Sequence, residues 1–506
     1  MLALDRTEFG SDFPDSGTPA TEYLWDYLEH LGARTFVREH HYVDRHYLDD
    51  FTSYYARSFR VPDHACRRLH YFDLTQRQLS ALLDRAHLAS AEERRKVEAK
   101  LSLAYLGFVV RRDLKRARLG RTVLRTYPLD GKRRYSAVRP YVVHLGALQL
   151  QVIGLAYQQQ DGGAAVCAST ALWSALQKVA HMAGHRTPTP SAITAASKSP
   201  YAASYGLDDS QMAHAIATLG YGADLIGAQG DPATFRALLA ACLRSHLPVI
   251  LAVEDLNGSH AITVTGYSEP DDVVDVPPYE GEETSLRMRA GAVRVIYAHD
   301  DNLGSHAHYE LVDAPPQDLM ESWVDQNRSP DGLWLLRGRS DKTQPAWWTE
   351  SWMRVASAIV PKPSKVRMPV TDLLKLAWAL RHTAAIIFDG LEIDYEVAFT
   401  TGVEYRRQMF EMRLEKARLR AFHESAVFPR HLAVMTVRCG ENHLCDFLLD
   451  ATAVDLGPDD ESLIAIVAPG VPARSLAWKN VESVAEFTQI PIIGAPPAPP
   501  KRRRSS

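Results

Sequence analysis

Apolar residues follow two periods in the central part of the chain, between residues 151 and 315. Helical spacing predicts one helix that begins near Cys167 and two more over 208–220 and 231–245. Unbroken apolar runs predict strands over 247–254, 260–267 and 292–301. Helices alternate with short strands in this region, which predicts an α+β domain.

The regions on either side show weaker patterns of the same kind. Over 21–150, possible capping boxes at Thr75 and Ser90 precede two helices, and strands are expected over 104–110 and 121–127. Over 370–487, we expect a charged amphipathic helix at 404–422 followed by strands. These are predicted α+β domains, and their patterns do not indicate a role.

Three other segments lack such periods. Residues 1–20 are expected to be disordered, and so is the Pro-rich tail at 488–506 with its basic end. Residues 316–369 are interpreted as a linker or docking arm. The predicted organisation is therefore a central domain at 151–315 with a further α+β domain on each side.

Composition restricts the classes of function. A chain of 506 residues is expected to form two or three domains. The net charge of −4 argues against nucleic-acid binding and against attraction to an anionic membrane. Five cysteines without paired spacing fit a reducing compartment, and we find neither a leader-like start nor a membrane-spanning apolar run. We therefore expect a cytoplasmic protein; its oligomeric state is not predicted.

Cys167 stands between a glycine-containing segment and the start of a helix. A free thiol has a pKa of about 8.5, so little of it is thiolate at neutral pH. The helix dipole contributes roughly 0.3 to 1 kcal/mol, which is less than one pKa unit. A nucleophilic role for Cys167 therefore needs a histidine.

His260 has the most suitable setting, because a turn places it at the start of an apolar strand. Its ring needs an acceptor that fixes the tautomer, and the strand ending in "YAHDDN" offers one. We favour Asp300, while strand alternation leaves Asp301 possible. The oxyanion of an acyl intermediate would be stabilised by the Cys167 amide and by an upstream glutamine: Gln158, Gln159 or Gln160.

The residues in this order resemble a known family. "CASTALW" opens a helix, "LPVIL" and "GSHAITVTGY" follow, and a later strand ends in "HDD". This arrangement is similar to the papain-like fold in its bacterial peptidase C39-like form, over about residues 150–315. The resemblance implies Cys167 as nucleophile, His260 as base and Asp300 as orienting acid, with Gln160 or Gln159 in the oxyanion hole.

The predicted function is hydrolysis of a peptide or amide bond by a cysteine peptidase, with a protein or peptide as substrate. Two alternatives stay open: a thiol acyltransferase on the same fold, and a non-catalytic scaffold that has kept the fold. The mechanism requires no metal and no organic cofactor. Two clusters that could suggest a metal are better explained as ordinary structure: the histidines and acid at 40–46, and Cys439, His443 and Cys445.

Overall fold

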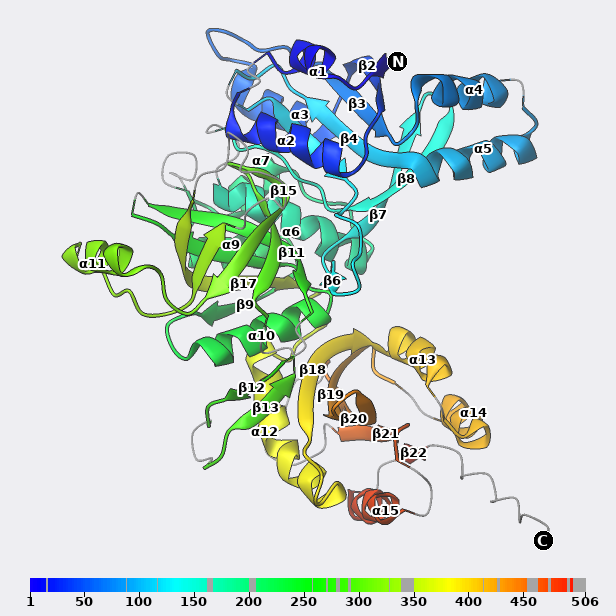
Figure 1. Cartoon of the computed structure of the whole chain (residues 1–506), viewed down its shortest axis with the longest axis vertical. Helices are drawn as coiled ribbons and strands as arrows, with labels where there is room; N and C mark the ends of the chain where they lie inside the picture. Colours follow the sequence, from blue (N-terminus) through cyan, green and yellow to red (C-terminus); the bar gives the residue numbers. More distant parts are fainter. Residues whose placement is uncertain are drawn as a thin grey trace. The chain divides into compact units, whose positions relative to one another are not determined.

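The computed structural model covers the whole chain (Figure 1). It describes all residues except 15–16, 88, 116, 162–166, 200–205, 257, 270–271, 279–282, 290–292, 327, 338–349, 413, 426–427, 453–462, 472–474, 489–491 and 495–506. The chain forms two compact units, each assembled from separated segments. Unit 1 comprises 1–229, 247–268 and 294–363, and unit 2 comprises 230–246, 269–293 and 364–506. The molecule is of mixed α+β class.

The main sheet of unit 1 closes on itself. Its strands pair in the order β10-β11-β14-β15-β16-β17, and β17 pairs back onto β10. Strand β9 pairs with the remainder of β17. The strands are β9 (Gly222–Gly227), β10 (Val249–Glu254), β11 (Ser259–Ser268), β14 (Val295–Asp300), β15 (Gly304–Val312), β16 (Trp334–Arg337) and β17 (Trp352–Lys362).

Helix α6 (Cys167–Ala183) packs against this closed sheet, chiefly on β11 (Figure 1). Its apolar side chains are buried along nearly its whole length, and Leu172, Trp173 and Leu176 are fully buried. The Thr263 hydroxyl on β11 donates a hydrogen bond to the Ala171 carbonyl at 2.8 Å. The helix that begins with the candidate nucleophile is thus anchored to the strand that carries His260 at its second position.

The N-terminal part of unit 1 forms a second sheet in the order β1-β2-β3-β4-β5, followed by the hairpin β7–β8. Its strands are β1 (Leu2–Ala3), β2 (Thr35–Tyr42), β3 (Cys66–Phe72), β4 (Tyr105–Arg111), β5 (Leu119–Leu124), β7 (Arg139–Leu145) and β8 (Leu148–Gly154). Other elements of unit 1 are α2 (Pro19–His30), α3 (Arg45–Asp50), α4 (Gln76–His87), α5 (Ala91–Ala104), β6 (Arg133–Arg134), α7 (Pro190–Ala196) and α9 (Asp209–Thr218).

The predicted disorder of residues 1–20 is wrong for the described part of that segment. Strand β1 pairs with β2, and helix α1 (Arg6–Asp12) follows it. Phe9 and Phe13 are buried, and the buried Asp12 carboxylate pairs with Arg38 and Arg67. The segment is short and polar on average, so its few burying residues did not produce a periodic signal.

The predicted linker at 316–369 is also wrong. Helix α11 (Gln317–Asp325) lies in it, and β16 and β17 complete the closed sheet. Residues of β17 are almost all buried from Val355 onward. A linker would leave this stretch exposed, whereas here it is the strand through which the ring closes.

Unit 2 is built on a sheet in the order β12-β13-β18-β19-β20-β21-β22. Helices α10 (Pro232–Arg244), α12 (Val370–Ile387) and α15 (Leu476–Thr488) also belong to it, with α13 (Gly402–Glu411) and α14 (Lys416–Ser425). The strands are β12 (Val273–Val276), β13 (Leu286–Arg289), β18 (Asp394–Thr401), β19 (His431–Cys439), β20 (Asn442–Asp450), β21 (Leu463–Ala468) and β22 (Ile492–Gly494).

The boundaries of the two units differ from the predicted domain ranges. Helix α10 and residues 269–293 fall within the predicted central range of 151–315 but belong to unit 2. Strand β13 pairs in parallel with β18, more than a hundred residues later in the chain (Figure 1). In the C-terminal region, the single helix expected at 404–422 is two helices, α13 and α14. The disorder predicted for 488–506 is wrong for the described part of that segment, because Thr488 ends α15 and β22 (Ile492–Gly494) pairs in parallel with β21. Residues 489–491 and 495–506 lie outside the described part of the chain.

Local signals were more reliable than boundaries. Both predicted capping boxes are present: Thr75 and Gln78 exchange hydrogen bonds, and so do Ser90 and Glu93. Helix α10 begins with Pro232 after the Asp231 cap, as expected. Within the described part of the chain, no helix combines the length and the apolar character that crossing a membrane requires.

Helix α2 provides a test of packing near the hairpin that carries the candidate acid. A Cβ added to Gly304 would lie 2.1 Å from Cδ1 of the buried Tyr23, whose hydroxyl donates to the Ser305 carbonyl at 2.8 Å. We expect Gly304→Ala to lower the free energy of unfolding by about 1–3 kcal/mol, because the ring cannot move without losing that bond. Chemical denaturation of the full chain measures this change.

The control is Gly227→Ala in β9, where an added Cβ meets no atom within 4 Å. The loss from Gly304→Ala should also shrink in a Tyr23→Leu background, since the two positions are in contact. Equal effects for Gly304→Ala and Gly227→Ala would contradict this description of the packing.

Candidate functional site

The hairpin between β10 and β11 positions His260. Val253 pairs with His260 across the hairpin, and the turn is closed by the Asp255 carboxylate, which accepts the Gly258 N–H at 2.9 Å. The Asp255 N–H also donates to the Gly258 carbonyl. His260 therefore stands at the second position of a strand whose following residues are buried, which holds its ring in place.

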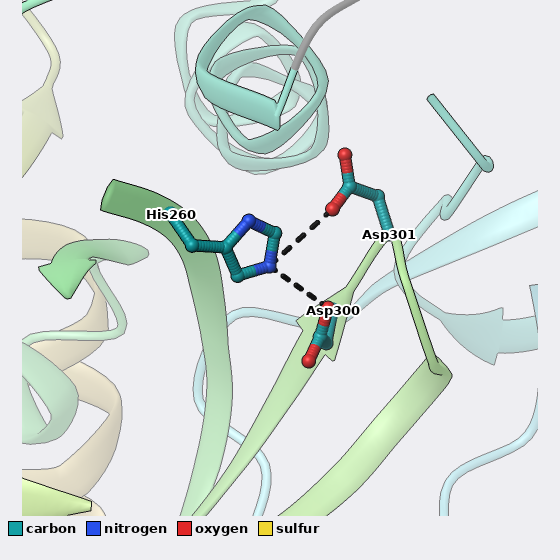
Figure 2. A group of neighbouring side chains, drawn as sticks. All are labelled: His260, Asp300 and Asp301. Atoms are coloured by element: carbon teal, nitrogen blue, oxygen red, sulfur yellow. Dashed lines mark hydrogen bonds and ion pairs between the residues drawn. The ribbon is translucent and has the colours of Figure 1, made fainter. Parts of the chain in front are cut away.

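The end of β14 brings two carboxylates to the same ring. The register with β15 shifts between Ala298 and Asp300, and the chain then turns, with the Leu303 N–H donating to the Asp300 carbonyl at 2.9 Å. Because strand geometry ends at Asp300, the next residue does not point to the opposite face. Figure 2 shows Asp300 and Asp301 both directed at one nitrogen of His260.

Asp300 is the better satisfied of the two acids. One of its oxygens accepts a hydrogen bond from His260 Nε2 at 2.9 Å and another from the Asn302 N–H at 3.0 Å. The other oxygen accepts from the Tyr309 hydroxyl at 2.5 Å and lies 4.0 Å from the Arg337 guanidinium. Burial opposes ionisation, but the His260 charge and these hydrogen bonds outweigh it and hold the pKa of Asp300 well below its usual range.

Asp301 is buried without such support. One of its oxygens lies 3.4 Å from His260 Nε2, but neither oxygen has a hydrogen-bond partner among the described residues. Burial raises the pKa of Asp301 to about 7; the His260 charge counteracts this and the Asp300 charge adds to it. Two carboxylates with the same neighbour thus have opposite protonation preferences.

The tautomer of His260 follows from its contacts. A carboxylate only accepts hydrogen bonds, so the bond to Asp300 places a proton on Nε2 and leaves Nδ1 to face another group. Burial alone would lower the pKa of His260, but Asp300, a hydrogen bond with the Cys167 side chain and Asp301 together raise it well above 6.5. The ring is therefore stabilised in its protonated form between the thiol and the acids.

Cys167 is the first residue of α6 and is partly exposed, whereas Cys66, Cys242 and Cys445 are buried. Figure 2 shows the second nitrogen of His260 on the side of the ring that faces a helix, which is drawn in the colour of α6. The preceding residues 162–166 lie outside the described part of the chain. The structure thus brings Cys167, His260 and Asp300 together, although 93 positions separate the first two and 40 separate the last two.

The three glutamines differ in their surroundings. Gln159 Oε1 accepts the Leu119 N–H at 3.3 Å, and Gln160 Nε2 donates to Asn302 Oδ1 at 2.9 Å. Gln158 is 3% exposed, and its Nε2 has no hydrogen-bond partner among the described residues. This segment runs beside the end of β14, through bonds from His299 Nε2 to the Leu155 carbonyl and from the Tyr157 hydroxyl to the Asp301 carbonyl.

The sequence did not indicate Tyr309 and Arg337, which support Asp300, or the unmet donor of Gln158. Tyr309 is placed by its register opposite Ile296, and Arg337 by the pairing of β16 with β15. Neither pairing leaves a local signal. The local hint for strand β15 is the apolar alternation over 304–312.

Ligand atoms of His260, Asp300 and Asp301 lie within 4.8 Å of one another, so these three residues could hold a metal ion. The clusters set aside in the sequence have structural roles. His46 accepts a hydrogen bond from the Trp173 indole at 3.1 Å, and His443 bonds to Asp446 at 2.8 Å.

Comparisons of the chain with protein-family models, with curated proteins and with solved structures gave no match. The chemistry of this site must therefore be argued from its own geometry.

The contrast between the acids predicts opposite effects on stability. With a pKa of about 7 when folded and about 3.9 when unfolded, Asp301 binds its proton more tightly in the folded protein, so its ionisation costs stability as pH rises from 4 to above 7. Asp301→Asn removes that cost. We expect its free energy of unfolding, relative to the parent, to increase by up to about 4 kcal/mol between pH 4 and pH 8.

Asp300→Asn is the matched control and should act in the other direction. The ionised Asp300 stabilises the fold above its unfolded pKa, so this variant should be weaker than the parent at pH 8 and approach it as pH falls below 4. Urea titrations in the presence of a chelator measure both. A pH-independent difference for Asp301→Asn would show that this carboxyl is not buried in an unpaired state.

Proposed function

We propose that this protein is a cysteine-dependent acyl-transfer enzyme, and specifically a peptidase or amidase, in which Cys167, His260 and Asp300 form the catalytic triad. The observation that carries the proposal is the orientation of His260. Asp300 holds Nε2, so Nδ1 is left for the thiol, and the Cys167 side chain itself contributes to stabilising the protonated ring. An activated thiol requires this order of contacts.

The steps follow from these contacts. His260 takes the thiol proton on Nδ1, and the Cys167 sulfur attacks the carbonyl carbon of the substrate. The protonated ring then gives its proton to the leaving amine as the carbon–nitrogen bond breaks, which leaves a thioester on Cys167. Water, deprotonated by the same ring, then attacks the thioester carbon; the carbon–sulfur bond breaks, the acid product leaves, and the ring returns the proton to the Cys167 sulfur. Asp300 remains ionised throughout and stabilises the imidazolium.

Two donors are proposed for the oxyanion. The N–H of Cys167 belongs to the first turn of α6, where amides have no partner within the helix. Gln158 is the better side-chain candidate, because its buried Nε2 donor is unused while Gln160 is already bonded to Asn302. The sequence had favoured Gln160 or Gln159, and the structure shifts our proposal to their neighbour. An unpaired buried donor is costly unless a ligand meets it.

The arrangement of elements supports a papain-like core as part of this proposal. A buried helix that begins with the cysteine packs on a closed antiparallel sheet that supplies the histidine and the acid. The choice of peptide or amide bonds rests on analogy with that fold. A transferase would share every step up to the thioester, and a scaffold protein would lack the activated thiol.

The reactivity of Cys167 tests the proposal. We expect iodoacetamide to alkylate Cys167 at pH 6 at least about tenfold faster than Cys439, because His260 forms a hydrogen bond with the Cys167 side chain and can accept its proton. Cys439 is a suitable reference in the same chain, since it too is partly exposed. Peptide mass spectrometry follows each cysteine separately, so no cysteine has to be replaced.

His260→Ala should reduce the rate at Cys167 to that of Cys439. If both cysteines react at the same rate in the parent protein, Cys167 is not activated, and the non-catalytic alternative is then favoured.

A nitrophenyl ester distinguishes oxyanion stabilisation from thiol reactivity. Acylation of Cys167 passes through a tetrahedral oxyanion, whereas alkylation by iodoacetamide does not. We expect Gln158→Met to slow acylation by about a hundredfold and to leave alkylation unchanged, because one oxyanion donor is lost. Nitrophenolate release measures acylation, and Gln160→Met serves as the control. An equal loss in both reactions would mean that Gln158 has only a structural role.

A further inference from the structure

We propose that His260, Asp300 and Asp301 form a binding site for a divalent transition-metal ion such as Zn²⁺, and that the bound ion switches the thiol site off. The inhibitory consequence rests on the proposed function, whereas the binding itself does not. The site is formed by His260 Nε2 and one oxygen from each carboxylate.

The spacing of these atoms suits a small cation. Zinc ligands at about 2.0–2.1 Å in a tetrahedral arrangement lie about 3.3 Å from one another. His260 Nε2 is 2.9 Å from the Asp300 oxygen and 3.4 Å from the Asp301 oxygen. Both distances from the ring nitrogen are therefore close to the required spacing, and the two carboxylate oxygens lie within 4.8 Å of each other.

Asp301 is the independent observation that points to a ligand. Its side chain is 3% exposed and directed at the His260 ring, and neither oxygen has a hydrogen-bond partner among the described residues (Figure 2). Buried polar groups are nearly always hydrogen-bonded, so such a carboxylate needs an explanation. One N–H cannot satisfy two carboxylates, whereas a doubly charged ion would satisfy both.

The surroundings favour a particular class of ion. One imidazole nitrogen with two carboxylate oxygens suits Zn²⁺ and similar divalent transition-metal ions better than Mg²⁺ or Ca²⁺, which prefer all-oxygen sites. The Tyr309 hydroxyl orients the Asp300 carboxylate, as outer partners do at metal sites. Arg337, 4.0 Å from Asp300, is the nearby positive charge that opposes binding, so we expect moderate rather than tight affinity.

Binding would change the chemistry of the ring. The ion replaces the proton on Nε2, which is released to solvent, and the remaining ring proton then occupies Nδ1. With a metal on one nitrogen and a proton on the other, His260 can no longer accept the proton of Cys167. Metal binding and catalysis are therefore mutually exclusive at this residue.

Calorimetric titration of the full chain with Zn²⁺ tests the binding. We expect Asp301→Asn and His260→Ala to weaken binding at this site at least about tenfold, while Cys167→Ala and the exposed β15 variant Glu310→Gln retain it. Circular dichroism verifies the fold of each variant. Binding lost in Cys167→Ala but retained in Asp301→Asn would overturn the inference, because the ion would then lie between Cys167 and Nδ1. Binding unaffected by Asp301→Asn and by Cys167→Ala would also overturn it.

Alkylation of Cys167 tests the switch. Zn²⁺ should slow labelling of the parent at least about tenfold, a chelator should restore it, and the rate in Asp301→Asn should not respond to the metal. Labelling of the parent that Zn²⁺ leaves unchanged, despite binding at Asp301, would overturn the inhibitory role. An unreactive thiol in metal-free protein would refute the proposed function, and the calorimetric comparison would still decide the metal site.

Discussion

The pairing of β17 with β10 is the constraint on which unit 1 depends. Strand β17 pairs through residues 354–359 with β10 on one side, and with β16 and β9 on the other. This pairing closes the sheet and fixes β10, and β10 in turn fixes β11 and His260. Because a closed sheet has no free edge here, the start of β11 and the end of β14 are held together on a rigid support.

Within this frame, the site depends on the unequal treatment of two adjacent acids. Asp300 receives donors from His260, Asn302 and Tyr309, whereas the Asp301 carboxyl has the ion pair with His260 and weaker support from nearby backbone N–H groups. Burial penalises both charges; the His260 charge and the hydrogen bonds outweigh that penalty at Asp300, whereas at Asp301 the Asp300 charge adds to it. The first acid can orient and stabilise an imidazolium, while the second is available for a proton or a cation.

The sequence predicted those features of the fold that depend on residues close together in the chain. Caps, the Pro232 helix start and unbroken apolar runs act within a few positions, and the structure contains each of them. The relation of Cys167, His260 and Asp300 was inferred from chemical need and from a resemblance, and these residues do converge. The sequence favoured Asp300 but could not exclude Asp301, and the turn after β14 directs both acids at the ring, so strand alternation does not separate them.

The missed features all depend on distant pairing. Nothing within 352–362 shows that this stretch will be enclosed by three other strands, and nothing within 286–289 shows that it will join β18. The short N-terminal segment is ordered by ion pairs of Asp12 with arginines on β2 and β3. Such partners are separated by tens to hundreds of residues, so only the folded chain reveals them.

Among the described residues near Cys167, His260 and Asp300, the buried groups without a hydrogen-bond partner include the amide of Gln158 and the carboxyl of Asp301. Close by, Asp300 accepts the Asn302 N–H, Gln160 donates to Asn302, and His299 bonds to the Leu155 carbonyl. The unpaired Gln158 amide is a hydrogen-bond donor and suits an anion, whereas the unpaired Asp301 carboxyl is an acceptor and suits a cation. The oxyanion of a reacting carbonyl would meet the first, and a cation or proton would meet the second.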